Sequence, residues 1–216
     1  MKKEHHFTLG EEIANAITHG IGILLSIAGL VLLIVFASLQ GSAWHVISFT
    51  IFGITMVFLY TSSTLLHSLP PGKAKHVFEI LDHSSIYFFI AGSYTPFLLI
   101  VVRGSLGWTL FGVVWAIAIG GTIFKVFFVK RFIIFSTVLY VVMGWLIVFS
   151  WDTLTSAIAK EGIVLLAVGG MLYTLGTIFY VWRGFKFHHM IWHLFVLGGT
   201  ITHFFSVILY VLPISI

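Results

Sequence analysis

The sequence contains no cysteine among its 216 residues. This absence excludes disulfide bonds, thiolate metal sites and cysteine nucleophiles. A transition metal bound by this chain must therefore be held by histidine, aspartate or glutamate. Charge is also scarce, because Asp, Glu, Lys and Arg together make up 8% of the residues. A soluble domain is nearer to about a quarter charged, so this composition is typical of an integral membrane protein.

Apolar residues are abundant instead, at 59% of the chain, and they occur in long runs from about residue 17 onward. A membrane-spanning helix needs about 20 mostly apolar residues. Seven runs fit, separated by charged or turn-forming segments. Their approximate ranges are 17–38, 44–67, 83–102, 107–128, 132–150, 162–182 and 190–212. We therefore predict an all-α integral membrane protein with a seven-helix transmembrane bundle.

This pattern defines a single transmembrane domain at residues 17–212, preceded by a short segment at residues 1–16. Glu11, Glu12 and Asn15 stand before the first apolar run, and no small-residue cleavage site follows it, so we expect an uncleaved span. All of the 11 Lys and Arg residues except Arg103 and Lys160 fall on one side of the predicted membrane. The positive-inside rule then predicts a cytoplasmic amino terminus and an external carboxyl terminus. The basic residues sit in short loops and form no stripe, so we expect no nucleic-acid partner.

Histidines and an aspartate share one depth in this topology. His67 ends the second span, Asp82 opens the third, and His189 and His193 open the seventh, all at the predicted cytoplasmic side. His189 and His193 are four residues apart, so they share one face of a helix. This spacing lets one helix offer two imidazoles to one metal, with His67 as the third ligand of an open zinc site. Charged and ionisable residues inside a membrane are costly, which favours a functional site over decoration.

Asp82 and Ser63 could complete the chemistry of this site. The helical protease motif places a glutamate directly after its first histidine, and "HMIWH" has none. A hydrolytic site would need another base, and Asp82 is the available carboxylate, either as a base for an activated water or as a fourth ligand. Ser63 lies one turn before His67 and could hydrogen-bond a ligand, although such hydroxyls commonly bond to their own helix.

A second polar group lies on the first span and deep in the seventh. Glu11, Asn15 and His19 are spaced by four residues and form one stripe, which could either take part in the site or cap and hydrate the helix end. His203 lies about 15 Å beyond His193 along the helix, too far to bind the same metal. We expect it to be a hydrogen-bonded residue inside the bundle.

Several of these motifs occur together and in order. The pattern "ExxNxxTH" between Glu11 and His19, "SSTLLH", "LDHSSIYFFIAGSYTP" and "HMIWHLFVLGGTITHF" resemble the hemolysin III family. This family is the bacterial branch of the adiponectin and progestin receptor superfamily, which is related to the alkaline ceramidases. The resemblance covers residues 11 to about 205. It implies a protein of the bacterial plasma membrane with a seven-helix bundle and a cytoplasmic amino terminus. It also implies a zinc ion held by His67, His189 and His193, with Asp82 and Ser63 close by.

The resemblance and the residues together favour a zinc-dependent hydrolase that cleaves an amide or ester in a membrane lipid and serves lipid homeostasis. About 16 residues precede the first predicted span, so we expect no protein hormone as a partner. Two alternatives stay open. One is a non-enzymatic hemolysin, pore-former or lipid sensor with a structural zinc. The other is a proton or cation transporter that uses Glu11, His19 and His203.

Overall fold

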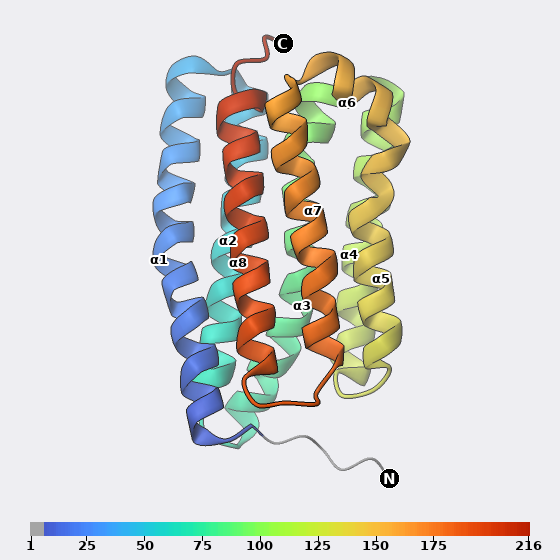
Figure 1. Cartoon of the computed structure of the whole chain (residues 1–216). Helices are drawn as coiled ribbons and strands as arrows, with labels where there is room; N and C mark the ends of the chain where they lie inside the picture. Colours follow the sequence, from blue (N-terminus) through green and yellow to red (C-terminus); the bar gives the residue numbers. More distant parts are fainter. Residues whose placement is uncertain (1–6) are drawn as a thin grey trace.

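The computed structural model describes residues 7–216, and these residues form helices connected by short turns (Figure 1). The elements in chain order are α1 (Leu9–Gln40), α2 (Ala43–Ser68), α3 (Lys73–Pro96), the π-helical η1 (Phe97–Val102), α4 (Gly104–Phe128), α5 (Ile133–Trp145), the 3-10 helix η2 (Leu146–Ser150), α6 (Trp151–Ala157), α7 (Lys160–Val181), α8 (His188–Ser206) and the π-helical η3 (Val207–Val211). Where consecutive elements are joined end to end, they make seven segments long and apolar enough to cross a membrane. The predicted seven-helix bundle is therefore confirmed.

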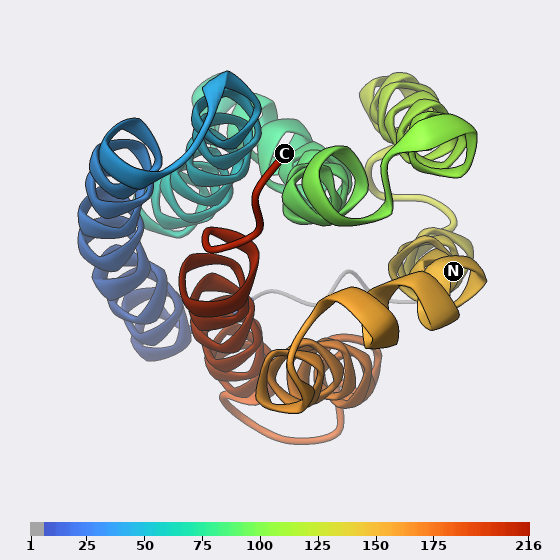
Figure 2. The same cartoon turned by 90° about the horizontal axis from the view of Figure 1, so that it is seen from above.

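The seven segments follow one another around the bundle, and α8 returns to pack against both α1 and α7 (Figure 2). Because the segments alternate in direction, the start of α1, the end of α2 and the starts of α3 and α8 meet at one end. We call this the α1 end of the bundle. The carboxyl terminus lies at the opposite end (Figure 1).

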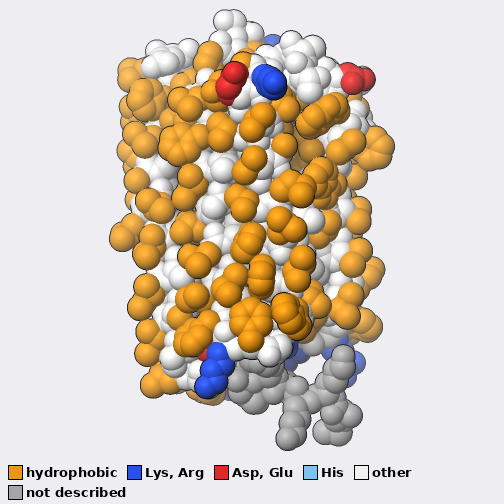
Figure 3. Space-filling model, in the orientation of Figure 1, with side chains coloured by type: hydrophobic (Ala, Val, Ile, Leu, Met, Phe, Trp, Pro, Cys, Tyr) orange, Lys and Arg blue, Asp and Glu red, His pale blue; other side chains and the backbone are white. Residues whose placement is uncertain are grey.

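The outer surface is apolar over most of its height. Figure 3 shows hydrophobic side chains over the middle of the visible face, with Lys, Arg, Asp and Glu confined to its two ends. Large apolar side chains such as Leu24, Ile123 and Val138 are more than two-fifths exposed, which is favourable only against lipid. The seven spanning segments and the apolar outer surface are those of an integral membrane protein.

Three helices extend beyond the predicted apolar runs, and the local sequence explains the first and the third. The first helix begins at Leu9 instead of residue 17, because Thr8 and Glu11 form a capping box that starts it earlier. The third begins at Lys73 instead of residue 83, directly after Pro70, Pro71 and Gly72, so Asp82 lies inside the helix and not in its first turn. The fifth span continues past residue 150 through α6 to Ala157.

The basic residues predicted to be cytoplasmic gather at the α1 end wherever the structure describes them. Lys125 differs from the others, since its side chain is fully buried near the end of α4 and does not lie in a loop. The count that favoured a cytoplasmic amino terminus still holds without Lys125, and the orientation stays a prediction.

Candidate metal centre

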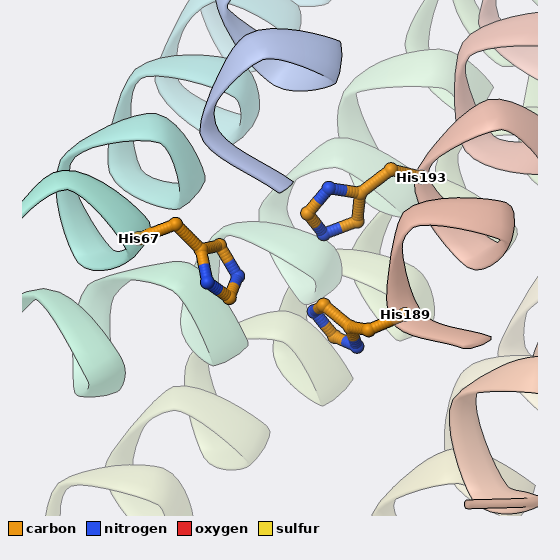
Figure 4. Close-up of side chains that lie close together, drawn as sticks. All are labelled: His67, His189 and His193. Atoms are coloured by element: carbon orange, nitrogen blue, oxygen red, sulfur yellow. The ribbon is translucent and has the colours of Figure 1, made fainter. Parts of the chain in front are cut away.

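Three histidines from two helices converge near the α1 end. His67 projects from the last turn of α2, and His189 and His193 project from the first two turns of α8 (Figure 4). One nitrogen from each ring lies within 4.8 Å of one nitrogen from each of the other two. All three side chains are at most 9% exposed. The structure therefore assembles the three imidazoles that the sequence placed at one depth.

The local sequence explains why α8 presents this pair. The spacing of four residues puts His189 and His193 on one face. The helix begins after Phe187, which adopts a left-handed backbone conformation with φ of 63°. This conformation is uncommon for a residue with a side chain and has to be stabilised by its surroundings. The Phe187 backbone N–H donates to Oε1 of Glu11 at 3.0 Å, so α1 helps to fix the start of α8.

In His67 and His193, Nδ1 contacts residues of α1, and this leaves Nε2 as the nitrogen that could bind a metal. Nδ1 of His67 lies 2.6 Å from Oε2 of Glu12. Nδ1 of His193 lies 3.3 Å from the carbonyl oxygen of Asn15 and 3.3 Å from Oγ1 of Thr18. Nε2 of His67 is buried and has no hydrogen-bond partner among the described residues. A buried nitrogen without a partner is costly, and a metal ion at the centre of the cluster would satisfy it. The residues present therefore fit a metal ion.

Two of the candidate ligands, His189 and His193, border a cavity of about 100 Å³. Asp82 also lines it, and most of the lining is apolar, with side chains such as Phe89 and Trp192. A separate outer groove is lined entirely by residues of α5 and α7. Val141 and Thr177 border both the cavity and this groove. The cavity thus approaches the lipid-facing surface between α5 and α7.

The two residues predicted to assist the metal site, Asp82 and Ser63, are both buried. Asp82 is 8% exposed and lines the cavity, and Ser63 is fully buried with no hydrogen-bond partner for Oγ among the described residues. Asp82 is not one of the residues whose ligand atoms lie within 4.8 Å of one another. The structure thus assembles a cluster of three ligand atoms from the three histidines.

The predicted stripe on α1 is buried against the bundle. His19 stacks on the ring of His193, with ring centroids 3.5 Å apart, and it also lines the cavity. Asn15 reaches His193 through its carbonyl, and Glu11 holds Thr8 and Phe187. His203 bonds the carbonyl of Leu166 through Nε2 at 3.1 Å, as expected for a residue inside the bundle.

Sequence reasoning missed Glu12 and Phe7. The quoted pattern "ExxN" fits Glu12 followed by Asn15, and this reading would have found the carboxylate that contacts His67. The ring of Phe7 lies close to His67, His188 and His189, with its centroid 5.1 Å from that of His189. No spacing rule points to Phe7, because it precedes the first helix and meets these rings only in the folded bundle.

These features define a class: a seven-helix integral membrane protein with a buried three-histidine cluster that could hold a metal ion. A family model described as haemolysin-III related matches residues 7–204, and the chain belongs to this family.

Relatives of known name agree with this assignment. The chain is 58% identical over 204 residues to the hemolysin-3 homolog of Bacillus subtilis (strain 168), covering 94% of this chain and 96% of that one. It is 56% identical over 203 residues to hemolysin-3 of Bacillus cereus, covering 94% and 93%. It is 32% identical over 209 residues to the human monocyte to macrophage differentiation factor, covering 93% and 84%. No solved structure matches the chain significantly.

Proposed function

We propose that this protein is a zinc-dependent hydrolase that cleaves an amide or ester bond in a membrane lipid, with a role in membrane lipid homeostasis. One observation carries the proposal: two histidines of the three-histidine cluster, His189 and His193, line a largely apolar cavity that Asp82 also lines. A metal clip that only joined two helices would need neither the cavity nor the carboxylate.

Zinc is the metal that best suits this donor set. Three imidazoles from the protein are a common ligand set for catalytic zinc, which keeps its remaining position open. A zinc ion bound here would polarise a carbonyl group and lower the pKa of a water molecule toward neutrality. His67, His189 and His193 are the residues that would hold it.

The chain's own residues would do the rest of the chemistry. Asp82 would take a proton from the attacking water as an oxygen–carbon bond forms, and then give it to the leaving nitrogen or oxygen as the scissile bond breaks. The hydroxyl of Ser63, one turn before His67, would donate to the oxyanion that develops on the carbonyl. The apolar cavity would hold the hydrocarbon part of the lipid.

The shared lining of the cavity and the outer groove supports a substrate from the bilayer. Val141 and Thr177 are the residues between the two spaces. A lipid chain approaching between α5 and α7 would pass apolar side chains, including Val138 and Ile178, and avoid water. Membrane lipid is therefore the partner that we propose.

The test combines metal content with turnover on detergent-purified protein. Elemental mass spectrometry should find about one zinc per chain. The same sample should hydrolyse at least one member of a panel of N-acyl and ester lipids. Wild type without bound metal would overturn the zinc site, and metal without turnover on the panel would favour a structural ion.

Asp82→Asn separates binding from catalysis. It should keep its zinc and lose about 10²- to 10⁴-fold in turnover, the usual contribution of a general acid–base group. Asp152→Asn is the matched control, because Asp152 is exposed near the start of α6 at the opposite end of the bundle. Full turnover in Asp82→Asn would remove Asp82 from the mechanism.

A further inference from the structure

The carboxylate of Glu12 stands directly behind one of the candidate metal ligands. Its Oε2 lies 2.6 Å from Nδ1 of His67. Nδ2 of Asn15 lies 3.5 Å from the same nitrogen, at the limit of a hydrogen bond. An ionised carboxylate can only accept hydrogen bonds, so at 2.6 Å from Glu12 the Nδ1 of His67 carries the proton and donates. The other ring nitrogen, Nε2, is then a free lone pair, and this is the buried nitrogen without a partner among the described residues.

A lysine holds the same carboxylate from the other side. Nζ of Lys75, in the first turn of α3, donates to Oε1 of Glu12 at 2.8 Å and to the carbonyl of Leu69 at 3.2 Å. Exposure increases outward along this chain of contacts, from 3% for the His67 side chain to 20% for Glu12 and 24% for Lys75. The contacts join α3, α1 and α2 and end at the centre of the histidine cluster.

His193 is supported in a different way. Its Nδ1 contacts the backbone carbonyl of Asn15 and the hydroxyl of Thr18, both on α1. A backbone carbonyl stays in place when the Asn15 side chain is changed. Substituting Glu12, by contrast, removes a charged side-chain contact to Nδ1 of His67.

The two adjacent glutamates have separate tasks. Glu11 accepts from the backbone N–H groups of Thr8 and Phe187, so it shapes the start of α1 and the loop before α8. Glu12 faces His67 and Lys75. Successive residues of a helix point about 100° apart, which explains how neighbours of the same type reach different partners.

We propose that Glu12 is a positioning residue for the metal centre: it fixes the ring orientation and the tautomer of His67, and Lys75 in turn holds Glu12 in place. This inference rests on the metal site of the proposed function, but it does not depend on hydrolysis. A carboxylate bonded to the far nitrogen of a ligating histidine is a common supporting contact, and its loss typically weakens metal affinity by about 10- to 100-fold.

The experiment measures zinc affinity on the detergent-purified full chain, by competition with a chromogenic chelator. Glu12→Gln and Glu12→Ala should bind zinc about 10- to 100-fold more weakly than wild type. Lys75→Met should have a smaller effect, up to about fivefold, because a partly exposed ion pair contributes modestly. The thermal midpoint of each variant without metal should stay close to that of wild type.

Glu79→Gln and Lys73→Met are the matched controls. Glu79 lies on α3, carries the same charge and is 24% exposed, but it pairs with His76 and not with the histidine cluster. Both controls should bind zinc as tightly as wild type. If Glu12→Ala fails to fold, the nearly isosteric Glu12→Gln decides.

Two results would overturn the proposal. Wild-type affinity in Glu12→Gln, with the metal bound, would show that His67 needs no anchor. An equal loss in Glu79→Gln would show a general effect of charge at this end of the bundle. Failure of the proposed metal site is read separately, as wild-type protein that binds no zinc.

Discussion

Two histidines on the same helix, His193 and His203, show what separates a candidate metal ligand from a structural residue. Both are buried and both line the internal cavity, about 15 Å apart along α8. At His193, contacts with α1 engage Nδ1, and the ring lies in the cluster with His67 and His189. At His203, Nε2 bonds the Leu166 carbonyl and the ring packs edge-on against Tyr173.

The comparison teaches that depth and residue type do not decide the role of a buried histidine. The neighbours decide it. Around His193, the imidazoles of His67 on α2 and His189 on the preceding turn of α8 bring ring nitrogens close together, and His19 of α1 stacks on the ring. At His203, Nε2 bonds a backbone carbonyl, which satisfies that nitrogen and offers no second imidazole. A metal needs several ligands at one point, and within residues 7–216 only the α1 end of the bundle brings three together.

Replacing each histidine in turn is the most direct test of whether His193 and His203 have different roles. His193→Ala should abolish stoichiometric metal binding, because it leaves two of the three imidazoles. His203→Ala should keep one metal per chain but lose roughly 1–3 kcal/mol of stability, since its hydrogen bond to the Leu166 carbonyl and its packing against Tyr173 are both removed. Elemental analysis and thermal unfolding in detergent measure the two effects. Equal metal loss in both variants would mean that the two positions do not differ in role.

Metal removal should lower the stability of variants that keep the three-histidine cluster and leave variants without it unchanged. A ligand held at about 100 times its dissociation constant stabilises the folded state by about 3 kcal/mol. Stripping zinc with a chelator should therefore lower the thermal midpoint of wild type and of His203→Ala by similar amounts. The same treatment should leave His189→Ala unchanged. A chelator shift in His189→Ala would place the stabilising ion elsewhere.

A methyl group added near His203 should disturb packing but not metal binding. A Cβ on Gly199 would lie 2.6 Å from Cε1 of Tyr173, the ring that packs against His203, so Gly199→Ala should cost about 1–3 kcal/mol. A Cβ on the adjacent Gly198 would lie 3.4 Å from the end of the Leu172 side chain, an ordinary contact. Gly198→Ala is therefore the control, and both variants should retain zinc. Zinc loss in Gly199→Ala would show that packing around His203 is coupled to the three-histidine cluster.

The smallest expected effect comes from one hydroxyl near His203. Tyr60 and Tyr173 both donate to Oγ1 of Thr200, at 2.8 Å and 3.1 Å. Tyr173→Phe should cost about 0.5–1.5 kcal/mol, because Thr200 keeps its bond from Tyr60. Unfolding of Tyr173→Phe beside Tyr60→Phe checks this, and metal content should be that of wild type in both. A cost well above this range would mean that the hydroxyl has a further role.

Much of the architecture follows from the sequence alone. Apolar runs of membrane length predict seven spans, since each crossing must bury its own backbone hydrogen bonds in helices. Alternating directions then place His67, Asp82, His189 and His193 at one end. The spacing of four residues predicts that His189 and His193 share a face. All of this depends on local periodicity and chain length, which a sequence displays directly.

The tertiary structure decided the rest. The tasks of Glu11 and Glu12 depend on which neighbours α1 meets, and a stripe of polar residues does not reveal that. The burial of Lys125 and the contact of Phe7 with the histidines likewise arise from packing between distant segments. The sequence determined that histidines would share a depth in the membrane. Only the packing of α1 against α2 and α8 decided which nitrogens are bonded and which face the centre, because those contacts join residues up to 178 positions apart.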